Sequence, residues 1–340
     1  MPSKPRSEIV DPDQVGVYHC WNRLVQRRHL FGLDLLTGKD YSYRKAWVRD
    51  RLRELAASMA IDILDYSILD NHLHVVLRNR PDIAAGWSDE EVARRWWRVC
   101  PLRRNADGSV PDPKPCEIGL LITQVDEYRG RLSDISWLMR LACQPIARRA
   151  NREDDVDGRF FAKRFDCRRL ETEAEVLTCS LYVDLNVIHA GKADTPEASE
   201  FTSAFDRIRA RWQSVQCEME TAVSAEEEAD AWLAPVFLDE RAGASLPTSD
   251  EGDGQPECRP IGSPRLSDKG FLTMTVDQYL TLLDTLGRMI HRGKRGHIPA
   301  ELPPILQRLQ LDPLAWFDWL IDLFGQPPDL VRPPGLASPL

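Results

Sequence analysis

The chain has 340 residues, of which 43% are hydrophobic and 29% charged, and its formal net charge is −9. This length and composition predict a folded protein of about two domains and exclude a collagen, a coiled-coil rod and a wholly disordered chain. No apolar run reaches the ~18 residues of a transmembrane helix, and we expect no membrane partner and no secretion signal. The eight cysteines contain no CxxC pair, which favours a reduced, cytoplasmic protein.

Apolar periodicity predicts helices and strands in a β-α-β-β order, followed by further helices. A turn-prone Asp70-Asn71 pair separates the second and third strands, which we expect to be antiparallel. The pattern indicates an α+β fold with an antiparallel sheet packed under helices. The predicted elements are strands over 15–21, 63–69 and 72–77, and helices over 42–60, 89–99, 131–152, 172–190, 276–291 and 312–324.

Changes in composition divide the chain into three predicted parts. Residues 14–215 form the principal domain, with an insertion at about 80–118. Residues 216–268 are acidic and rich in Gly and Pro, which predicts a linker. Residues 269–340 predict a small helical C-terminal region. Residues 221–340 hold 18 acidic and 10 basic residues, so the chain is not expected to coat nucleic acid unspecifically, although a local basic groove stays possible.

His72 and His74 are separated by one residue on a predicted strand. Side chains alternate along a strand, so both imidazoles point to one face, where they can share a metal ion. Leu73, Val75 and Leu77 would then face the core. The alternative interpretation is a pair of surface histidines on an edge strand.

Tyr182 and Asn186 are four residues apart on the helix predicted over 172–190. That spacing puts both side chains on one face of the helix. A capping-box pattern at Thr172 and Glu175 supports the start of this helix, and Gly191 suits its end. The alternative interpretation is a half-buried tyrosine beside an incidental asparagine.

Residues 159–169 interleave cations with aromatic rings. Cations suit phosphates and rings suit bases, so this composition is typical of a surface for single-stranded nucleic acid. A solvated loop is the alternative interpretation. The candidate DNA-binding residues are Arg23, Arg148, Arg149, Lys163, Arg164, Phe165 and Arg168.

Four motifs occur together in one order. They are Tyr18-His19 with Arg23 and Phe31, then Asp70-Asn71-His72-Leu73-His74, then Gly158 to Phe165, then Leu181-Tyr182 to Asn186 and Gly191. In this order the chain resembles the single-tyrosine HUH transposases, especially the branch associated with repetitive extragenic palindromes. The resemblance covers about residues 14–205.

The resemblance implies a ferredoxin-like (RRM-like) domain with the two histidines on a central strand. It implies a divalent metal, Mg²⁺ or Mn²⁺, held by His72, His74 and Asn186. It also implies that Tyr182 is a nucleophile that cuts single-stranded or hairpin DNA and leaves a 5′-phosphotyrosine link. The protein would then be a DNA nickase and strand-transferase, as a monomer or a homodimer.

Two other functions stay open at the level of sequence. One is a domesticated descendant that binds DNA hairpins without cutting them. The other is an unrelated metal-dependent hydrolase that uses the two histidines with a nearby carboxylate, for which Asp65 and Asp70 are the candidates.

Overall fold

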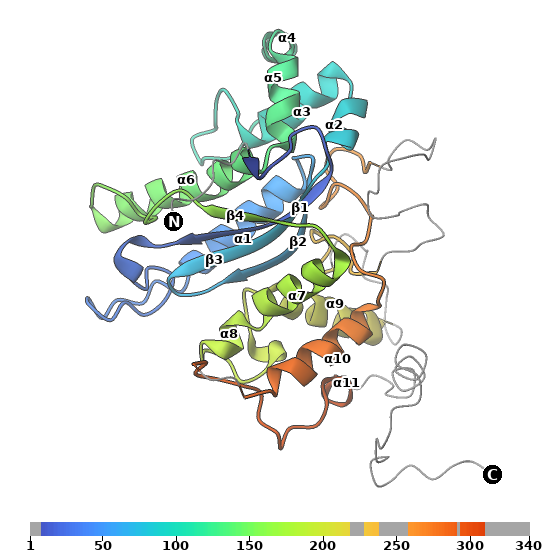
Figure 1. The fold of residues 1–340 in the computed structure, drawn as a ribbon. Helices are drawn as coiled ribbons and strands as arrows, with labels where there is room; N and C mark the ends of the chain where they lie inside the picture. Colours follow the sequence, from blue (N-terminus) through green and yellow to red (C-terminus); the bar gives the residue numbers. More distant parts are fainter. Residues whose placement is uncertain (1–7, 218–227, 238–257, 291–292, 310–340) are drawn as a thin grey trace, which may run out of the picture.

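The computed structural model describes residues 8–217, 228–237, 258–290 and 293–309. Its centre is a four-stranded antiparallel sheet with the order β2-β3-β1-β4, and helices cover both faces (Figure 1). The predicted α+β class with an antiparallel sheet is confirmed. The strands are β1 (Gly16–Arg23), β2 (Ile61–Ile68), β3 (His72–Asn79) and β4 (Asp166–Leu170).

β1 lies between β3 and β4, and its register decides which side chains meet. Arg23 pairs with His72 across β1 and β3. His19 pairs with Arg168 across β1 and β4. Residues directly opposite each other in a sheet share a face, and His74, two residues after His72, lies on that face as well. The sheet therefore gathers three histidines and two arginines on one face.

The opposite face of the sheet packs against α1 (Arg44–Ala56) and α6 (Ile135–Asp154). Leu73, Val75 and Leu77 are buried there, in the same apolar core as the inner faces of both helices. The helix predicted over 131–152 begins only at α6. Residues 131–133 belong instead to a preceding helix, and Asp134 caps α6 by accepting a hydrogen bond from the Ser136 backbone nitrogen.

The histidine-bearing face is covered by helices from later in the chain, around a second apolar core. The helix predicted over 172–190 is in fact two helices, divided at Leu185. Thr172 caps the first by accepting from the Glu175 backbone nitrogen at 3.2 Å, and Gly191 follows the second with φ +67°. The helices on the histidine-bearing face are α7 (Glu173–Asp184), α8 (Asn186–His189), α9 (Ser203–Cys217), α10 (Val276–Gly287) and α11 (Ile305–Arg308).

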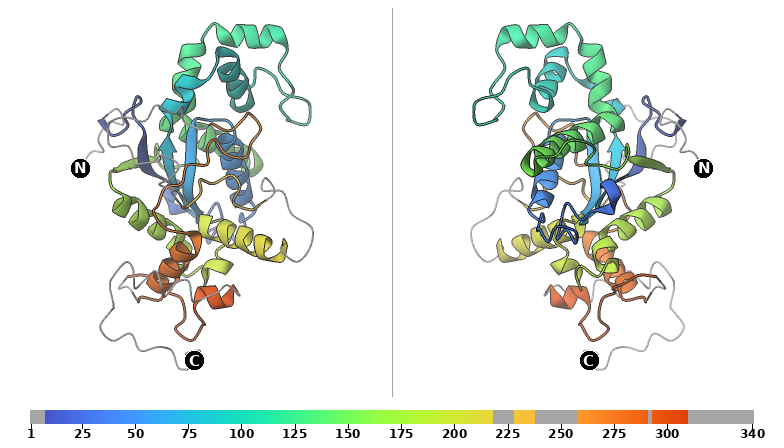
Figure 2. Two further views of the ribbon diagram at one scale, coloured as in Figure 1. Left: turned by 90° about the vertical axis from the view of Figure 1, so that its right-hand side faces the viewer. Right: turned by 90° about the vertical axis from the view of Figure 1, so that its left-hand side faces the viewer.

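Four helices lie between β3 and α6, in and just after the predicted insertion. They gather at the end of the molecule away from α10 and α11 (Figure 2). The Trp96 ring, on the second of these helices, stacks on the Tyr128 ring of the fourth helix, with ring centroids 4.7 Å apart. They are α2 (Pro81–Gly86), α3 (Asp89–Val99), α4 (Pro115–Ile122) and α5 (Val125–Ser133).

The described segments after residue 257 pack against the sheet and its helices. Arg78 of β3 donates to the carbonyl oxygens of Lys269 and Gly270, at 2.6 and 2.8 Å, and Leu266 is buried in the first core. The helix predicted over 276–291 is α10. The helix predicted over 312–324 lies outside the described residues, as does much of the stretch predicted as a linker. None of the helices in the described segments is long and apolar enough to cross a membrane.

Candidate active site

Two histidines, a tyrosine and an asparagine meet under α7. His72 and His74 project from β3 with ring centroids 5.0 Å apart. The Tyr182 ring, from α7, lies 5.7 Å from the His74 ring. Nδ2 of Asn186, at the start of α8, lies 3.4 Å from His72 Nε2. The structure thus brings together the four side chains that the resemblance names as nucleophile and ligands.

The histidines are not a surface pair on an edge strand. β3 lies between β2 and β1 in the sheet, and His74 is buried. His72 is partly covered at the start of the strand. Imidazole nitrogens that are shielded from water on a central strand need partners, and the site provides them.

The turn before β3 orients His72. In the assigned orientation of the Asn71 amide, its Oδ1 lies 2.6 Å from His72 Nδ1, and an amide oxygen only accepts hydrogen bonds. Nδ1 therefore carries the proton, and the lone pair of Nε2 points toward Asn186. Ligating histidines are commonly oriented in this way by a partner on the other ring nitrogen.

A third histidine, absent from the predicted ligand set, completes the cluster. His19 of β1 places its Nε2 2.9 Å from His74 Nδ1, and the two rings are stacked with centroids 5.1 Å apart. The His19 ring also contacts the Tyr182 ring, at 6.2 Å between centroids. His19 therefore orients His74 in the way that Asn71 orients His72.

Burial keeps these imidazoles neutral. Desolvation, with Arg168 nearby, lowers the pKa of His19 to about 4. Desolvation, with Arg23 nearby, lowers the pKa of His72 to about 4. For His74, desolvation and the neighbouring histidines lower the pKa well below its usual value. Neutral imidazoles have a nitrogen lone pair to offer at pH 7.

Tyr182 stands at the open side of this cluster. Its side chain is 41% exposed, and no hydrogen bond of its hydroxyl is found within the described part of the chain. Partial burial raises its pKa, and the nearby Arg23 acts in the opposite direction. Lys294, from the loop after α10, lies with Nζ 5.4 Å from the centre of the ring. The hydroxyl is thus accessible, with two cations in its neighbourhood.

The predicted DNA-binding residues divide into separate places. Arg23 and Arg168 lie on the histidine-bearing face of the sheet, beside the site. Arg148 and Arg149 are on α6, which covers the opposite face. The guanidinium group of Arg149 lies 3.7 Å above the Trp47 ring. These two arginines therefore lie away from Tyr182.

Lys163, Arg164 and Phe165 lie in a third place, a groove between α6 and the segment before β4. The groove has a volume of about 920 Å³. It opens next to β4, the edge strand of the sheet. Its lining includes the cations Arg140, Arg159, Lys163 and Arg164 and the aromatic rings Trp137, Phe161 and Phe165.

The carboxylates nearest to the histidines in sequence are engaged in ion pairs. Asp65 is fully buried and pairs with Arg207 at 2.6 Å. Asp70 pairs with Lys45 at 2.8 Å and with Lys192 at 2.6 Å. Within the described residues, no group of three or more His, Cys, Asp or Glu side chains is placed to hold a metal ion. A metal here would depend on an amide as its third protein ligand.

The side chains of His72, His74 and Asn186 fit a metal site with two imidazole ligands and one amide ligand. The Nε2 lone pair of His72 faces the Asn186 side chain, and a 180° rotation of this amide exchanges its nitrogen for its oxygen. Imidazole nitrogen and amide oxygen are acceptable ligands for Mn²⁺, and oxygen ligands suit Mg²⁺.

No model of a protein family matches the sequence, and no curated protein matches it either. Among solved structures, a REP-associated tyrosine transposase bound to a REP hairpin is similar, with a TM-score of 0.35 and 11% sequence identity. The match covers 61% of this chain and 86% of that chain. It is a distant likeness of fold and says nothing about the chemistry of the site.

Proposed function

We propose that the protein is a metal-dependent DNA nickase and strand-transferase of transposase type. It acts on single-stranded or hairpin DNA through a 5′-phosphotyrosine intermediate. One observation carries the proposal: α7 and α8 bring Tyr182 and Asn186 against His72 and His74. An accessible phenol beside two neutral imidazoles is suited to phosphoryl transfer.

In the proposed reaction the phenolic oxygen of Tyr182 attacks the scissile phosphorus. A bond forms between this oxygen and phosphorus, and the bond from phosphorus to the 3′ oxygen breaks. The phenol gives up its proton, and the departing 3′ oxygen takes one to become a hydroxyl group. The new ester conserves the bond energy, so the 3′-hydroxyl group can later attack it and rejoin strands without an external energy source.

His72, His74 and Asn186 would hold the metal in this proposal. Bound Mg²⁺ or Mn²⁺ supplies polarisation of the scissile phosphate and neutralises the charge of the transition state. His19 and Asn71 would orient the ligands without binding the metal, since each contacts the Nδ1 atom of a ligating histidine.

The DNA strand would reach the site across the edge of the sheet. Arg168 lies on β4 beside His19, and Arg23 lies beside His72. The groove at Arg164 lies around the same edge, on the face covered by α6. Cations on both sides of β4 favour a single strand that wraps over this edge.

The finer description of the fold belongs to this proposal. The connection β1-α1-β2-β3-α6-β4 with the sheet order β2-β3-β1-β4 supports a ferredoxin-like domain. Residues 14–215 would be that domain, with α2, α3 and α4 as its insertion. α10 and α11, from the region predicted at 269–340, would be an addition that covers the histidine-bearing face.

A hydrolase that uses the histidines without the tyrosine is disfavoured by the carboxylates. Asp65 and Asp70 are both held in ion pairs. Neither is placed as a free base or a third ligand. A protein that only binds DNA hairpins would not need the accessible hydroxyl of Tyr182.

The test is a covalent-adduct assay. Labelled single-stranded oligonucleotides from the DNA flanking the gene, with any hairpins included, are incubated with protein and Mn²⁺ or Mg²⁺. A denaturing gel then shows whether labelled DNA travels with the protein. Tyr182→Phe is the decisive variant. Tyr128→Phe on α5 is its matched control, because in the described structure that hydroxyl bonds only to Gln124, the residue that precedes the same helix.

We expect an adduct that needs metal, disappears with Tyr182→Phe and survives Tyr128→Phe. Tight binding without an adduct on any flank would favour the non-cleaving protein. Cleavage that survives Tyr182→Phe would favour the hydrolase.

A further inference from the structure

The chain after α10 returns to the active site. The backbone nitrogen of Arg295 donates to the carbonyl oxygen of His189, at the end of α8, across 3.0 Å. Gly296 packs so closely that an added Cβ would collide with the carbonyl oxygen of Ile188 and approach the backbone of Gly191. Only glycine fits this approach. The loop 293–297 is therefore docked on α8, the short helix that begins at Asn186.

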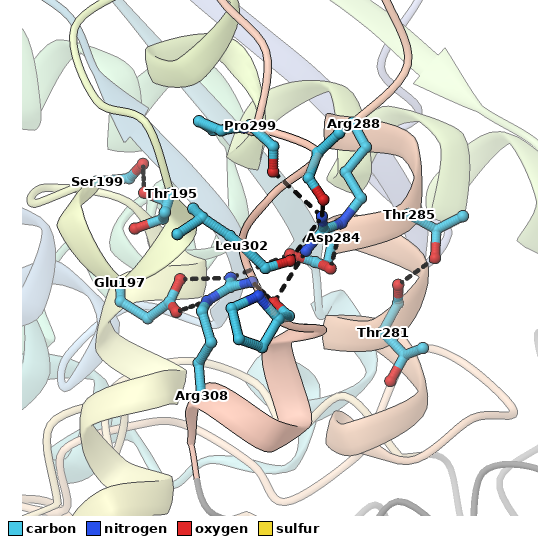
Figure 3. A network of polar contacts seen from close by, with 12 residues as sticks. Thr195, Glu197, Ser199, Thr281, Asp284, Thr285, Arg288, Pro299, Leu302 and Arg308 are labelled. Atoms are coloured by element: carbon cyan, nitrogen blue, oxygen red, sulfur yellow. Dashed lines mark hydrogen bonds and ion pairs between the residues drawn. The ribbon is translucent and has the colours of Figure 1, made fainter. Parts of the chain in front are cut away.

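Two arginines hold the chain on either side of this loop (Figure 3). Arg288 donates to Asp284 at 2.9 Å and to the carbonyl oxygens of Pro299 and Leu302, at 3.2 and 3.1 Å. Arg308 donates to both oxygens of Glu197, at 2.5 and 3.0 Å, and to Asp284 at 3.0 Å. A guanidinium group that donates several hydrogen bonds fixes the orientation of the chain segments it joins as well as the distance between them.

Apolar packing holds the same chain from inside. Ile298 is fully buried in the second core. Its backbone nitrogen donates to the Gly287 carbonyl oxygen at 2.8 Å. Side-chain forks and a buried anchor thus define where the loop 293–297 lies.

Lys294 stands at the tip of this loop. Its Nζ lies 5.4 Å from the centre of the Tyr182 ring. The side chain is exposed, and within the described segments no carboxylate forms an ion pair with it. The ammonium group is therefore available to an anion that approaches Tyr182 from solvent.

We propose that Lys294 is a further catalytic residue, which binds the scissile phosphate beside Tyr182 and stabilises the negative charge that develops there. This inference rests on the proposed nickase function. Because the ammonium group lies 5.4 Å from the centre of the Tyr182 ring, it can contact a phosphate that the phenolic oxygen attacks. Preformed cations at the position where charge develops are a large source of rate enhancement.

The geometry also gives the C-terminal region a role. Its anchors, Arg288, Ile298 and Arg308, lie away from the reacting atoms and fix the loop that carries Lys294. Gly296 is a positioning residue, because its close approach to α8 sets the place of Lys294.

The test compares single-turnover adduct formation by the full chain at saturating single-stranded DNA. Lys294→Met keeps the length of the side chain and removes its charge. Lys294→Arg keeps the charge. Lys114→Met, at the start of α4, is the matched loss of an exposed lysine remote from the site. The dissociation constant for DNA and the midpoint of thermal unfolding are measured for every variant.

We expect Lys294→Met to slow adduct formation about tenfold or more, with a much smaller change in DNA affinity. Lys294→Arg should recover most of the rate, and Lys114→Met should leave it unchanged. Gly296→Ala, which displaces the loop without removing the cation, should also slow the reaction.

Equal rates for Lys294→Met and the unchanged chain would overturn the role of Lys294 while the nickase function stands. A fall in DNA affinity with an unchanged rate at saturating DNA would assign Lys294 to binding alone, which also overturns it. If the unchanged chain forms no adduct, the proposed function itself fails.

Discussion

The hydroxyl group of Tyr279 on α10 donates a hydrogen bond to Asp184 on α7, across 2.7 Å. Both side chains are buried. Asp184 also accepts hydrogen bonds from the Ser203 hydroxyl and the Ala204 backbone nitrogen. Burial, with Asp65 nearby, raises the pKa of Asp184 to about 7, while Arg207 acts in the opposite direction. A C-terminal helix is thus bonded to the helix that carries the proposed nucleophile.

Tyr279→Phe removes one donor from this buried carboxylate. A buried acceptor that loses its partner destabilises the fold by about 1–3 kcal/mol. We expect the free energy of unfolding in urea to fall by that amount. Tyr128→Phe is the control, since its hydroxyl bonds to Gln124 at the protein surface, and we expect a change below about 0.5 kcal/mol. Equal effects of the two substitutions would contradict the importance of the buried bond.

Arg207 on α9 is the cation that this network requires. It is buried, it lies 2.6 Å from Asp65 and 3.8 Å from Asp184, and it donates to the Leu64 carbonyl oxygen. Arg207→Met leaves two buried carboxylates without their cation. Loss of one partner from a buried ion pair costs about 3–5 kcal/mol, so we expect this fall in the free energy of unfolding.

Arg209→Met is the matched control for that substitution. Arg209 follows on the same helix but is exposed. A surface substitution of this kind changes stability by about 0.5 kcal/mol or less. A similar small change for Arg207→Met would show that the buried carboxylates find other partners.

His19 provides a prediction about the metal. Its contact with His74 Nδ1 fixes the ring of a proposed ligand. Loss of such an orienting partner typically lowers metal affinity about 10–100-fold. We therefore expect His19→Phe to raise by that factor the Mn²⁺ concentration that gives half-maximal adduct. His29→Phe, outside the site, should leave this concentration unchanged. An unaltered Mn²⁺ dependence with His19→Phe would count against the metal site as drawn here.

The elements of the site could be predicted where the signal is local. The turn at Asp70-Asn71 and the alternation from His72 to Leu77 are read from neighbouring residues, and the structure has the strand pair there. The helix that carries Tyr182 was likewise predicted from its cap and its spacing. Its division at Leu185 was not predicted, because apolar periodicity continues across that residue.

The missed features depend on pairing between distant segments. β4 is an edge strand, and most of its side chains are only partly buried, so its sequence lacks the apolar alternation of a strand. His19 became part of the site through the register of β1 against β3 and β4, which sequence patterns do not fix. Lys294 reaches Tyr182 only because the chain after α10 folds back on α8. No local pattern of residues indicates such a return.

The groove beside α6 leads to a prediction that separates two groups of arginines. Arg164 lines the groove and is exposed, whereas Arg148 is exposed on α6 and is not among the lining residues. If a DNA strand lies in the groove, Arg164→Ala removes one phosphate contact. The plot of log affinity against log salt concentration has a negative slope, and the magnitude of this slope should then decrease by about 1. Arg148→Ala is the matched control and should leave the slope unchanged.

The measurement is a salt titration of binding to a single-stranded oligonucleotide, made with the Tyr182→Phe background so that no strand is cut. A lower slope with Arg164→Ala alone would place the strand in the groove. A lower slope with Arg148→Ala alone would instead move the path of the DNA to the outer face of α6. Because α6 and the histidines lie on opposite faces of the sheet, that result would also require the strand to take a longer route around β4 before it reaches Tyr182.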